Sequence, residues 1–345
     1  MAPRLVFGAG GVGTTENSFT FTWDTPEKVA DLLRELRALG ITHLDSAASY
    51  PPNNPWNTET LLGQSGELQD SSSAFTVDTK VLVQRVNTNV AQGVPFLAPA
   101  AIASSLDKSL RLLNRESVHT FYAHANDGVT PFAEQAAAFD REVKAGRCAQ
   151  YGLSNYSVTA LRAFFAACEE HGYTKPAVYQ GMYNALQRKA EEELLPLLRQ
   201  HSCAFYAYSP LAGGFLTGKV TAARDSQDKD SRLARTRWQG ASAYSIYTNT
   251  FDKPAMHATI RTLKAACDVV AEGGPALTLQ EASLRWLLHH SAISSEHGDG
   301  IIFGAKTVDQ VHSNVAEMRR GPLPESVRGV VEGMYYEATR KAESL

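Results

Sequence analysis

Residues 26–50, PEKVADLLRELRALGITHLDSAASY, contain the unit that decides the fold. Apolar side chains recur every three or four residues, which predicts an amphipathic helix over Pro26–Leu39. Thr25 before Pro26 is a favourable start for this helix, because threonine caps helix N-termini and proline suits the first helical position. The short apolar run Thr42–Asp45 then predicts a strand that ends on a carboxylate.

The same unit recurs along the chain. Eight runs rich in Val, Ile, Tyr and Phe predict strands at Arg4–Gly8, Thr42–Asp45, Thr76–Lys80, Val118–His124, Gln150–Ser154, Val178–Gln180, Ala204–Ser209 and Ile301–Gly304. Amphipathic stretches between them predict helices at Pro26–Leu39, Ala101–Leu113, Pro131–Ala145, Val158–Glu170 and Arg188–Gln200. Thr130 before Pro131 repeats the helix-start signal. Eight strands alternating with helices predict an α/β fold, a closed (β/α)8 TIM barrel.

A doubly wound sheet is the alternative, because GAGGVGTTENSF after the first strand resembles a phosphate-binding turn. The glycines at 8, 10, 11 and 13 do not lead into a helical pattern, and FTFTW follows with strand-like alternation. We interpret the stretch as a glycine-rich turn at the top of the first strand. No repeat or linker divides the 345 residues, so a single domain over 1–345 is expected.

Composition excludes several classes of partner. The formal net charge of −3, with charges mixed along the chain, gives no reason to expect nucleic acid or an anionic membrane. A small-molecule substrate is expected instead. The four cysteines are far apart, and no histidines stand at metal-ligand spacing, so no metal is predicted. The first residues lack a signal-peptide pattern and no apolar run is long enough to cross a bilayer, which predicts a soluble, cytoplasmic protein.

Two segments are longer than ordinary connections. Residues 212–248, after the seventh strand, show weak periodicity and predict a long loop that covers a ligand. In the C-terminal tail, Glu325–Ala342 has a helical pattern.

Polar residues stand at the predicted strand ends, where the active site of a barrel is found. They are Asp45, Lys80, His124, Ser154, Asn155, Gln180 and Tyr208. Taken alone, Lys80 is better explained by a structural ion pair and His124 by a hydrogen-bonded wall residue. Together with Tyr50, five residues after Asp45, they form a proton-transfer set.

Elementary chemistry assigns roles within this set. A phenol titrates near pH 10 and donates its proton slowly at neutral pH unless a nearby cation stabilises the phenolate. Lys80 is that cation, Asp45 holds Lys80 charged and oriented, and His124 hydrogen-bonds the substrate oxygen. Tyr50 then supplies the proton while a hydride reaches the carbonyl carbon, which predicts carbonyl reduction by general acid catalysis.

Nearly the whole chain resembles the aldo-keto reductase superfamily, and LAGGFLTGK and FYAHAND are similar to its aflatoxin-aldehyde reductase branch. Further matching pieces are LDSAASY, DTK, GLSNYS, YQGMYN, AYSPLAGGFLTGK and IIFGAKTVDQVHSN. The resemblance implies that Asp45, Tyr50, Lys80 and His124 form a catalytic tetrad.

The resemblance also implies an NADPH/NADP+ site. Its residues would be Asp45, Ser154, Asn155, Gln180, Tyr208, Ser209, Pro210, Leu211, Gly213, Lys219, Arg237, Gly304, Ala305, Lys306, Gln310 and Asn314. Among them, Ser154, Asn155 and Gln180 would bind the carboxamide and Tyr208 would stack on the nicotinamide. The helix start after Thr307, with Lys306, suits a 2′-phosphate. Gln310 stands where many superfamily members have arginine.

Substrate contacts implied by the resemblance are Tyr50, His124, Tyr247 and Trp56. Thr250 stands where relatives of this branch have an arginine suited to carboxylated aldehydes, and the chain ends RKAESL without the usual C-terminal arginine. Neutral aldehydes or ketones are therefore expected. Trp56 follows Tyr50 in the proline-rich PPNNPWNTE and is interpreted as part of the substrate wall.

Two other functions stay open at this point. One is a non-enzymatic binding subunit, because aldo-keto reductase barrels that resemble potassium-channel β-subunits use nucleotide binding for regulation. The other is a Schiff-base aldolase barrel with Lys80 as the nucleophile. Members of the resembled branch often dimerise, so a homodimer is expected.

Overall fold

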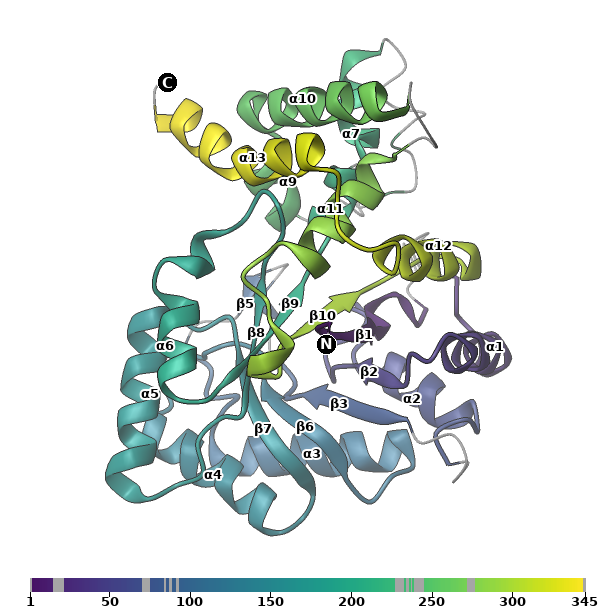
Figure 1. Ribbon diagram of the computed structural model, residues 1–345. Coiled ribbons are helices and arrows are strands. Elements are labelled where there is room, and N and C mark those ends of the chain that lie inside the picture. Colours follow the sequence, from purple (N-terminus) through teal and green to yellow (C-terminus); the bar gives the residue numbers. More distant parts are fainter. Residues whose placement is uncertain are drawn as a thin grey trace.

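The strand-forming runs assemble into a closed barrel of eight parallel strands, in the order β1-β10-β9-β8-β7-β6-β3-β2 (Figure 1). The computed structural model describes residues 2–14, 22–69, 75–83, 85–86, 89–90, 93–226, 233, 236, 238, 245–271 and 277–343. The barrel strands are β1 Arg4–Gly8, β2 His43–Asp45, β3 Thr76–Lys80, β6 Val118–Ala123, β7 Cys148–Ser154, β8 Val178–Met182, β9 Ala204–Tyr208 and β10 Gly300–Phe303. Pairing of β10 with β1 closes the barrel and confirms the predicted (β/α)8 fold.

Helices surround the barrel between successive strands. They are α1 Pro26–Ala38, α2 Asn57–Gln64, α3 Pro99–Leu113, α4 Phe132–Lys144, α5 Val158–His171 and α6 Leu194–Gln200. After β9 come α7 Lys219–Asp225, α9 Ser245–Phe251, α10 Pro254–Ala271 and α11 Leu279–His289, and after β10 come α12 Val308–Met318 and α13 Glu325–Glu343. Short 3-10 turns are η1 Ala9–Gly11, η2 Lys189–Glu191, η3 Ala212–Thr217 and η5 Ser295–His297, and β4 Arg85–Val86 pairs with β5 Asn89–Val90. Helices α10 and α13 pack together beyond the barrel (Figure 1).

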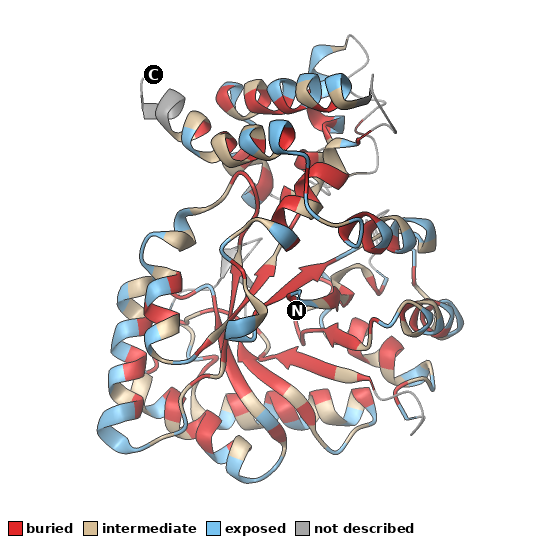
Figure 2. Cartoon of the chain, viewed as in Figure 1, coloured by how far each residue is buried: buried red, intermediate tan, exposed pale blue. Residues whose placement is uncertain are grey.

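Strand alternation divides the core into two regions. Val6 joins Tyr122, Val178, Tyr206 and Ile302 in one buried cluster inside the barrel. The next residue, Phe7, points the other way, into the large hydrophobic cluster between the strands and the helices. The strands are therefore buried on both faces, whereas outer helices such as α1 and α5 bury one side only (Figure 2).

One glycine makes room inside the barrel. A Cβ on Gly152 of β7 would lie 2.5 Å from Cε1 of Tyr122 and 2.7 Å from the carbonyl oxygen of Val178. The large ring of Tyr122 therefore fits only because residue 152 has no side chain.

Helix α1 begins as the sequence predicts. The Thr25 hydroxyl accepts a hydrogen bond from the Lys28 amide at 3.4 Å, and Pro26 is the first helical residue. Leu32, Leu33 and Leu36 are buried on one face. The C-terminal helical pattern is confirmed as α13. Among the described residues, no helix has both the length and the apolar character of a membrane span.

The predicted start of the fourth helix is wrong. Thr130 does not cap it, and α4 begins at Phe132 with Pro131 as its cap residue. Thr130 instead donates its hydroxyl to the Asp127 carboxylate at 2.7 Å, and the same carboxylate accepts the Thr130 amide at 2.9 Å. A charged acceptor two or three residues away forms a local turn that outcompetes the helix cap.

The predicted helix Arg188–Gln200 is broken into two pieces. Only η2 and α6 form, with α6 beginning at Leu194. Pro196 is the third residue of α6 and has no amide hydrogen, so it suits a first helical turn but would interrupt a continuous helix. Arg188 also donates to both oxygens of Glu191, at 2.8 and 2.9 Å, which stabilises the separate turn.

The glycine-rich stretch after β1 forms a turn and not a phosphate loop leading into a helix, because η1 is followed by Val12, which forms a β-bridge with Trp23. Residues 15–21 of this stretch lie outside the described residues. Residues 212–248 are more regular than predicted, since η3, α7 and the first part of α9 lie within them.

Candidate active site

Asp45 and Lys80 form a buried ion pair at the ends of β2 and β3. The Lys80 ammonium donates to both carboxylate oxygens of Asp45 and to the carbonyl oxygen of Ser46, each at 2.7 Å. Burial lowers the pKa of Lys80, but its neighbours together, with Asp45 the main one, outweigh burial and raise it. Lys80 is therefore a cation at neutral pH, and Asp45 fixes its position.

Tyr50 lies over this pair. Lys80 Nζ is 5.1 Å from the centre of the Tyr50 ring. Burial raises the pKa of Tyr50, and the Lys80 ammonium opposes that rise. The phenol is thus protonated at neutral pH and has a cation beside it to stabilise the phenolate. Gly10 in η1 lies beside this ring, and a Cβ there would be in ordinary van der Waals contact with it, 3.5 Å from Tyr50 Cε2.

His124 completes the predicted group of four. It follows β6 directly, is buried, and its ring meets the Tyr50 ring edge to face with centroids 5.7 Å apart. The structure therefore brings together all four residues that the sequence places at strand ends or in the adjoining loop. A carbonyl oxygen between the phenol and the imidazole would meet two polar groups at once.

Hydrogen bonds link the next strand ends to the same group. Gln180 donates to Asp45 at 2.8 Å, and Tyr208 donates its hydroxyl to Asn155 at 2.9 Å. Asn155 donates in turn to the Ser154 hydroxyl at 3.0 Å. Gln180 therefore lies beside the ion pair, and Asn155, which also donates to the His124 carbonyl oxygen at 3.0 Å, lies beside His124.

The segment after β9 has an unusual backbone. Ser209, Ala212, Gly213 and Gly214 all have positive φ, at 57°, 51°, 66° and 97°. Tyr247 of α9 packs on this backbone, because a Cβ on Gly213 would lie 2.8 Å from its ring, and its hydroxyl is 2.9 Å from the Ser209 hydroxyl. Within this turn the Ala212 amide donates to the Ser209 carbonyl oxygen at 2.9 Å and the Gly214 amide to the Leu211 carbonyl oxygen at 2.8 Å, so an anion would have to bind through the other amides of the segment.

Of the two basic residues predicted to bind the cofactor after β9, only Lys219 lies among the described residues. Lys219 is exposed at the start of α7, close in sequence to the turned backbone. Arg237 lies outside the described residues. Pro210 and Leu211 belong to the segment before η3.

The segment between β10 and α12 is held by reciprocal bonds. Thr307 accepts from the Gln310 amide at 3.2 Å, and the Gln310 side chain accepts from the Lys306 amide at 2.8 Å. Asn314 donates to the Gly304 carbonyl oxygen at 3.3 Å. Gln310 thus orders the helix start, with Ala305 in the loop it holds.

Trp56 packs against a helix. Lys108 of α3 lies over its ring, 4.4 Å from the centroid, and Trp56 itself has a positive φ of 75°. Thr250, in α9, is partly buried. The assignment of Trp56 to the substrate wall stays a prediction.

Sequence reasoning missed Glu59. This side chain of α2 is completely buried and accepts hydrogen bonds from the hydroxyls of Thr79, next to Lys80, and Ser109. Burial raises the pKa of Glu59 to about 7. Its only sequence signal is a carboxylate on the apolar face of the α2 pattern.

Comparison with known proteins places this chain in a family. The family model described as "Aldo/keto reductase family" matches residues 4–334. Human aflatoxin B1 aldehyde reductase member 2 is 36% identical over 305 residues, covering 88% of this chain and 80% of the relative. Human member 4 is 34% identical over 326 residues, 94% and 91% of the two chains, and the rat member 2 is 35% identical over 332 residues, 94% and 85%.

These matches agree with the motifs and the closed barrel, and family membership supports a carbonyl-reducing oxidoreductase. The chain belongs to the aldo/keto reductase family.

Proposed function

We propose that the protein is an NADPH-dependent reductase of aldehydes or ketones, with Tyr50 as the proton donor. The observation that carries this proposal is the buried Lys80–Asp45 pair beneath the Tyr50 ring. The pair supplies a fixed cation where a phenolate would form. The named aldehyde reductases among the relatives support aldehydes as one substrate class.

Proton transfer follows from the four side chains. The carbonyl oxygen binds between the Tyr50 hydroxyl and His124, and the phenol gives it a proton as negative charge develops there. The O–H bond of Tyr50 breaks as the alcohol O–H bond forms. The Lys80 ammonium stabilises the phenolate that remains, and Asp45 keeps Lys80 charged. When bound, NADPH supplies the hydride to the carbonyl carbon.

The cofactor would fit the donors around this site. Ser154, Asn155 and Gln180 carry the side-chain amide and hydroxyl groups that a carboxamide needs. Tyr208 is partly exposed beside them and offers a face for ring stacking. The turned backbone of residues 209–214, with Lys219, suits a pyrophosphate.

NADPH is preferred over NADH in this proposal because of the α12 start. Lys306 and the amides of the first turn of α12 suit the 2′-phosphate by charge and helix dipole. Gln310 contributes by holding the Lys306 amide in place. Asp45, also among the predicted cofactor residues, would contribute indirectly, by holding Lys80 and Gln180 in place.

The substrate is proposed to be a neutral aldehyde or ketone. Tyr247 of α9 contacts Ser209 at the end of β9. Thr250 of the same helix carries no charge that could pair with a substrate carboxylate. Trp56 would border the pocket from the α2 side. The cytoplasmic location and a homodimer stay predictions.

The two rival functions are less well supported. A Schiff-base aldolase needs a lysine with a lowered pKa, but the Asp45 carboxylate raises the pKa of Lys80. A purely regulatory subunit has no need of a phenol, a cation and an imidazole in contact.

The experiment incubates the purified full chain with NADPH and a simple aromatic aldehyde, without any added partner. Alcohol and NADP+ should form in equal amounts. Borohydride trapping of substrate on Lys80 without NADPH consumption would support the aldolase, and NADPH binding without alcohol formation would support the regulatory subunit.

A further inference from the structure

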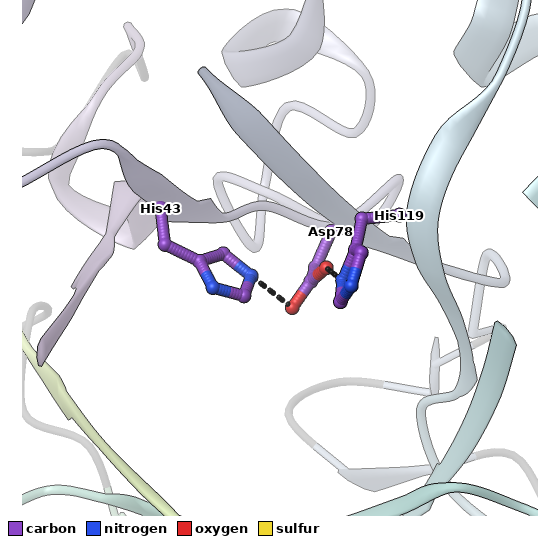
Figure 3. A group of neighbouring side chains, drawn as sticks. All are labelled: His43, Asp78 and His119. Atoms are coloured by element: carbon purple, nitrogen blue, oxygen red, sulfur yellow. Dashed lines mark hydrogen bonds and ion pairs between the residues drawn. The ribbon is translucent and has the colours of Figure 1, made fainter. Parts of the chain in front are cut away.

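A second polar cluster lies deeper in the same barrel. His43 of β2, Asp78 of β3 and His119 of β6 converge from three neighbouring strands (Figure 3). His43 Nε2 is 2.8 Å from Asp78 Oδ2, and His119 Nδ1 is 3.1 Å from Asp78 Oδ1. One nitrogen or oxygen of each residue lies within 4.8 Å of the others.

The carboxylate at the centre is enclosed. The Asp78 side chain is completely buried, and its two oxygens lie within hydrogen-bond distance of His43 and His119. The Thr120 amide also donates to it at 3.0 Å. Among the described residues, its ion-pair partners are the two histidines. A buried carboxylate is most stable beside a full positive charge, which a divalent ion would supply.

The three donors match the preferences of a transition metal. Two imidazole nitrogens and one carboxylate oxygen are a common ligand set for Zn²⁺ and related divalent ions. Ligands on a tetrahedral ion with bonds of about 2.0–2.1 Å stand roughly 3.3 Å apart. The nitrogen–oxygen distances of 2.8 and 3.1 Å go to the two different oxygens of Asp78, and one ligand atom from each residue lies within 4.8 Å of the others, so a small movement of the side chains would bring all three to one ion. We propose that His43, Asp78 and His119 form a binding site for a divalent transition-metal ion such as Zn²⁺.

Solvent can reach the cluster. The His119 side chain is 31% exposed, and a cavity of about 440 Å³ is lined by His43, Thr76 and Ile41 among others. Water from this side would fill the remaining coordination position. An imidazole whose N–H points at Asp78 would bind the ion in its other tautomer, with the proton on the opposite ring nitrogen and the lone pair facing the ion.

The site is distinct from the candidate active site but adjoins it, because Asp78 is paired in register with Asp45. His43 and Asp78 each stand two residues before Asp45 and Lys80 on the same strands, so they point into the same barrel roughly 7 Å nearer its N-terminal end. The ion would join β2, β3 and β6 and contribute to stability, and no reaction step depends on it.

Sequence spacing gives no warning of this site. His43 and Asp78 are 35 residues apart, and Asp78 and His119 are 41 apart, so no compact ligand motif exists. Only the pairing of β2, β3 and β6 brings them together.

The test uses the full chain without an affinity tag, stripped of metal by a chelator. Zn²⁺ is titrated by calorimetry, and Co²⁺ by visible absorption, which reports four-coordinate nitrogen and oxygen ligands. We expect saturable binding of one ion per chain and a higher melting temperature with Zn²⁺. His119→Ala should weaken Zn²⁺ binding by about 100-fold or more, since it removes a direct ligand.

The matched control is His312→Ala, which removes an exposed histidine paired with Glu35 and should leave Zn²⁺ affinity unchanged. Asp78→Asn should abolish the Co²⁺ spectrum, with circular dichroism checking the fold. If Asp78→Asn does not fold, the comparison of His119→Ala with wild type decides. Absence of saturable binding, or equal affinity in wild type and His119→Ala, overturns the proposal.

Discussion

Lys80 contacts Asp45 through two hydrogen bonds of equal length, with Nζ 2.7 Å from each carboxylate oxygen. The contact is buried, so neither charge is solvated by water. Such a pair depends on both partners, because one charge left alone in the core is costly. The contribution of the pair to stability and its role beneath Tyr50 can therefore be separated only by changing both partners.

Lys80→Met should remove activity and stability together. The carboxylate of Asp45 is then buried without its cation, so the free energy of unfolding should fall by about 3–5 kcal/mol. The rate of aldehyde reduction should fall by about 100-fold or more, because the phenolate loses its cation. Urea unfolding and NADPH-coupled assays measure the two effects. Adding Asp45→Asn should restore part of the stability and none of the activity; recovery of activity would refute the assigned role.

Glu59 predicts a pH-dependent stability. Its pKa in the folded protein, about 7, is above the ordinary value of 4.5, so the folded state binds the proton more tightly. This contribution is fully present below about pH 4.5 and is lost as the pH rises through 7, a change of about 3 kcal/mol. Glu59→Gln, which cannot ionise, should flatten this part of the pH profile of urea unfolding and make the protein more stable than wild type at pH 8. An unchanged profile would contradict the burial argument.

Gly152→Ala should destabilise the barrel. The new methyl group would overlap the Tyr122 ring and the Val178 carbonyl oxygen, which costs about 1–3 kcal/mol. Gly329→Ala in α13 is the matched control, because a Cβ there meets nothing within 4 Å and alanine favours a helix by roughly 0.5–1 kcal/mol. Thermal melting should move in opposite directions for the two variants. Equal shifts would mean that the Tyr122 packing does not require glycine.

Lys306→Met tests the preference for NADPH. Loss of one charge-assisted contact to the 2′-phosphate should weaken NADPH binding by about 10-fold while leaving NADH binding nearly unchanged. Lys264→Met, which removes an exposed lysine paired with Asp268, serves as the control. Fluorescence titration with both cofactors measures the ratio, and equal losses for NADPH and NADH would place the phosphate elsewhere.

Local pattern was sufficient for most of the barrel. All eight strands were predictable because each is a short apolar run between turn signals. The exact first residue was not: β7 begins at Cys148, two residues before the predicted Gln150. The contact between Asp45 and Lys80 was predictable as well, since parallel strand ends meet on one face. Helix starts that depend on competing side chains, as at Thr130, were not.

Long-range packing explains what the sequence left open. Glu59 appears as one more polar residue until Thr79 and Ser109 are brought to it by β3 and α3. The cluster around Asp78 depends on strands far apart in the chain. Such groups need the register of the sheet, which no local periodicity contains.

The most direct test of the central claim is Tyr50→Phe, measured as the single-turnover rate of aldehyde reduction at saturating NADPH. The phenylalanine ring keeps the packing against His124 but has no proton to give. We predict a rate loss of about 10²–10⁴-fold, with NADPH binding, followed by fluorescence, unchanged. A rate within twofold of wild type, with NADPH bound, would contradict the assignment of Tyr50 as the proton donor.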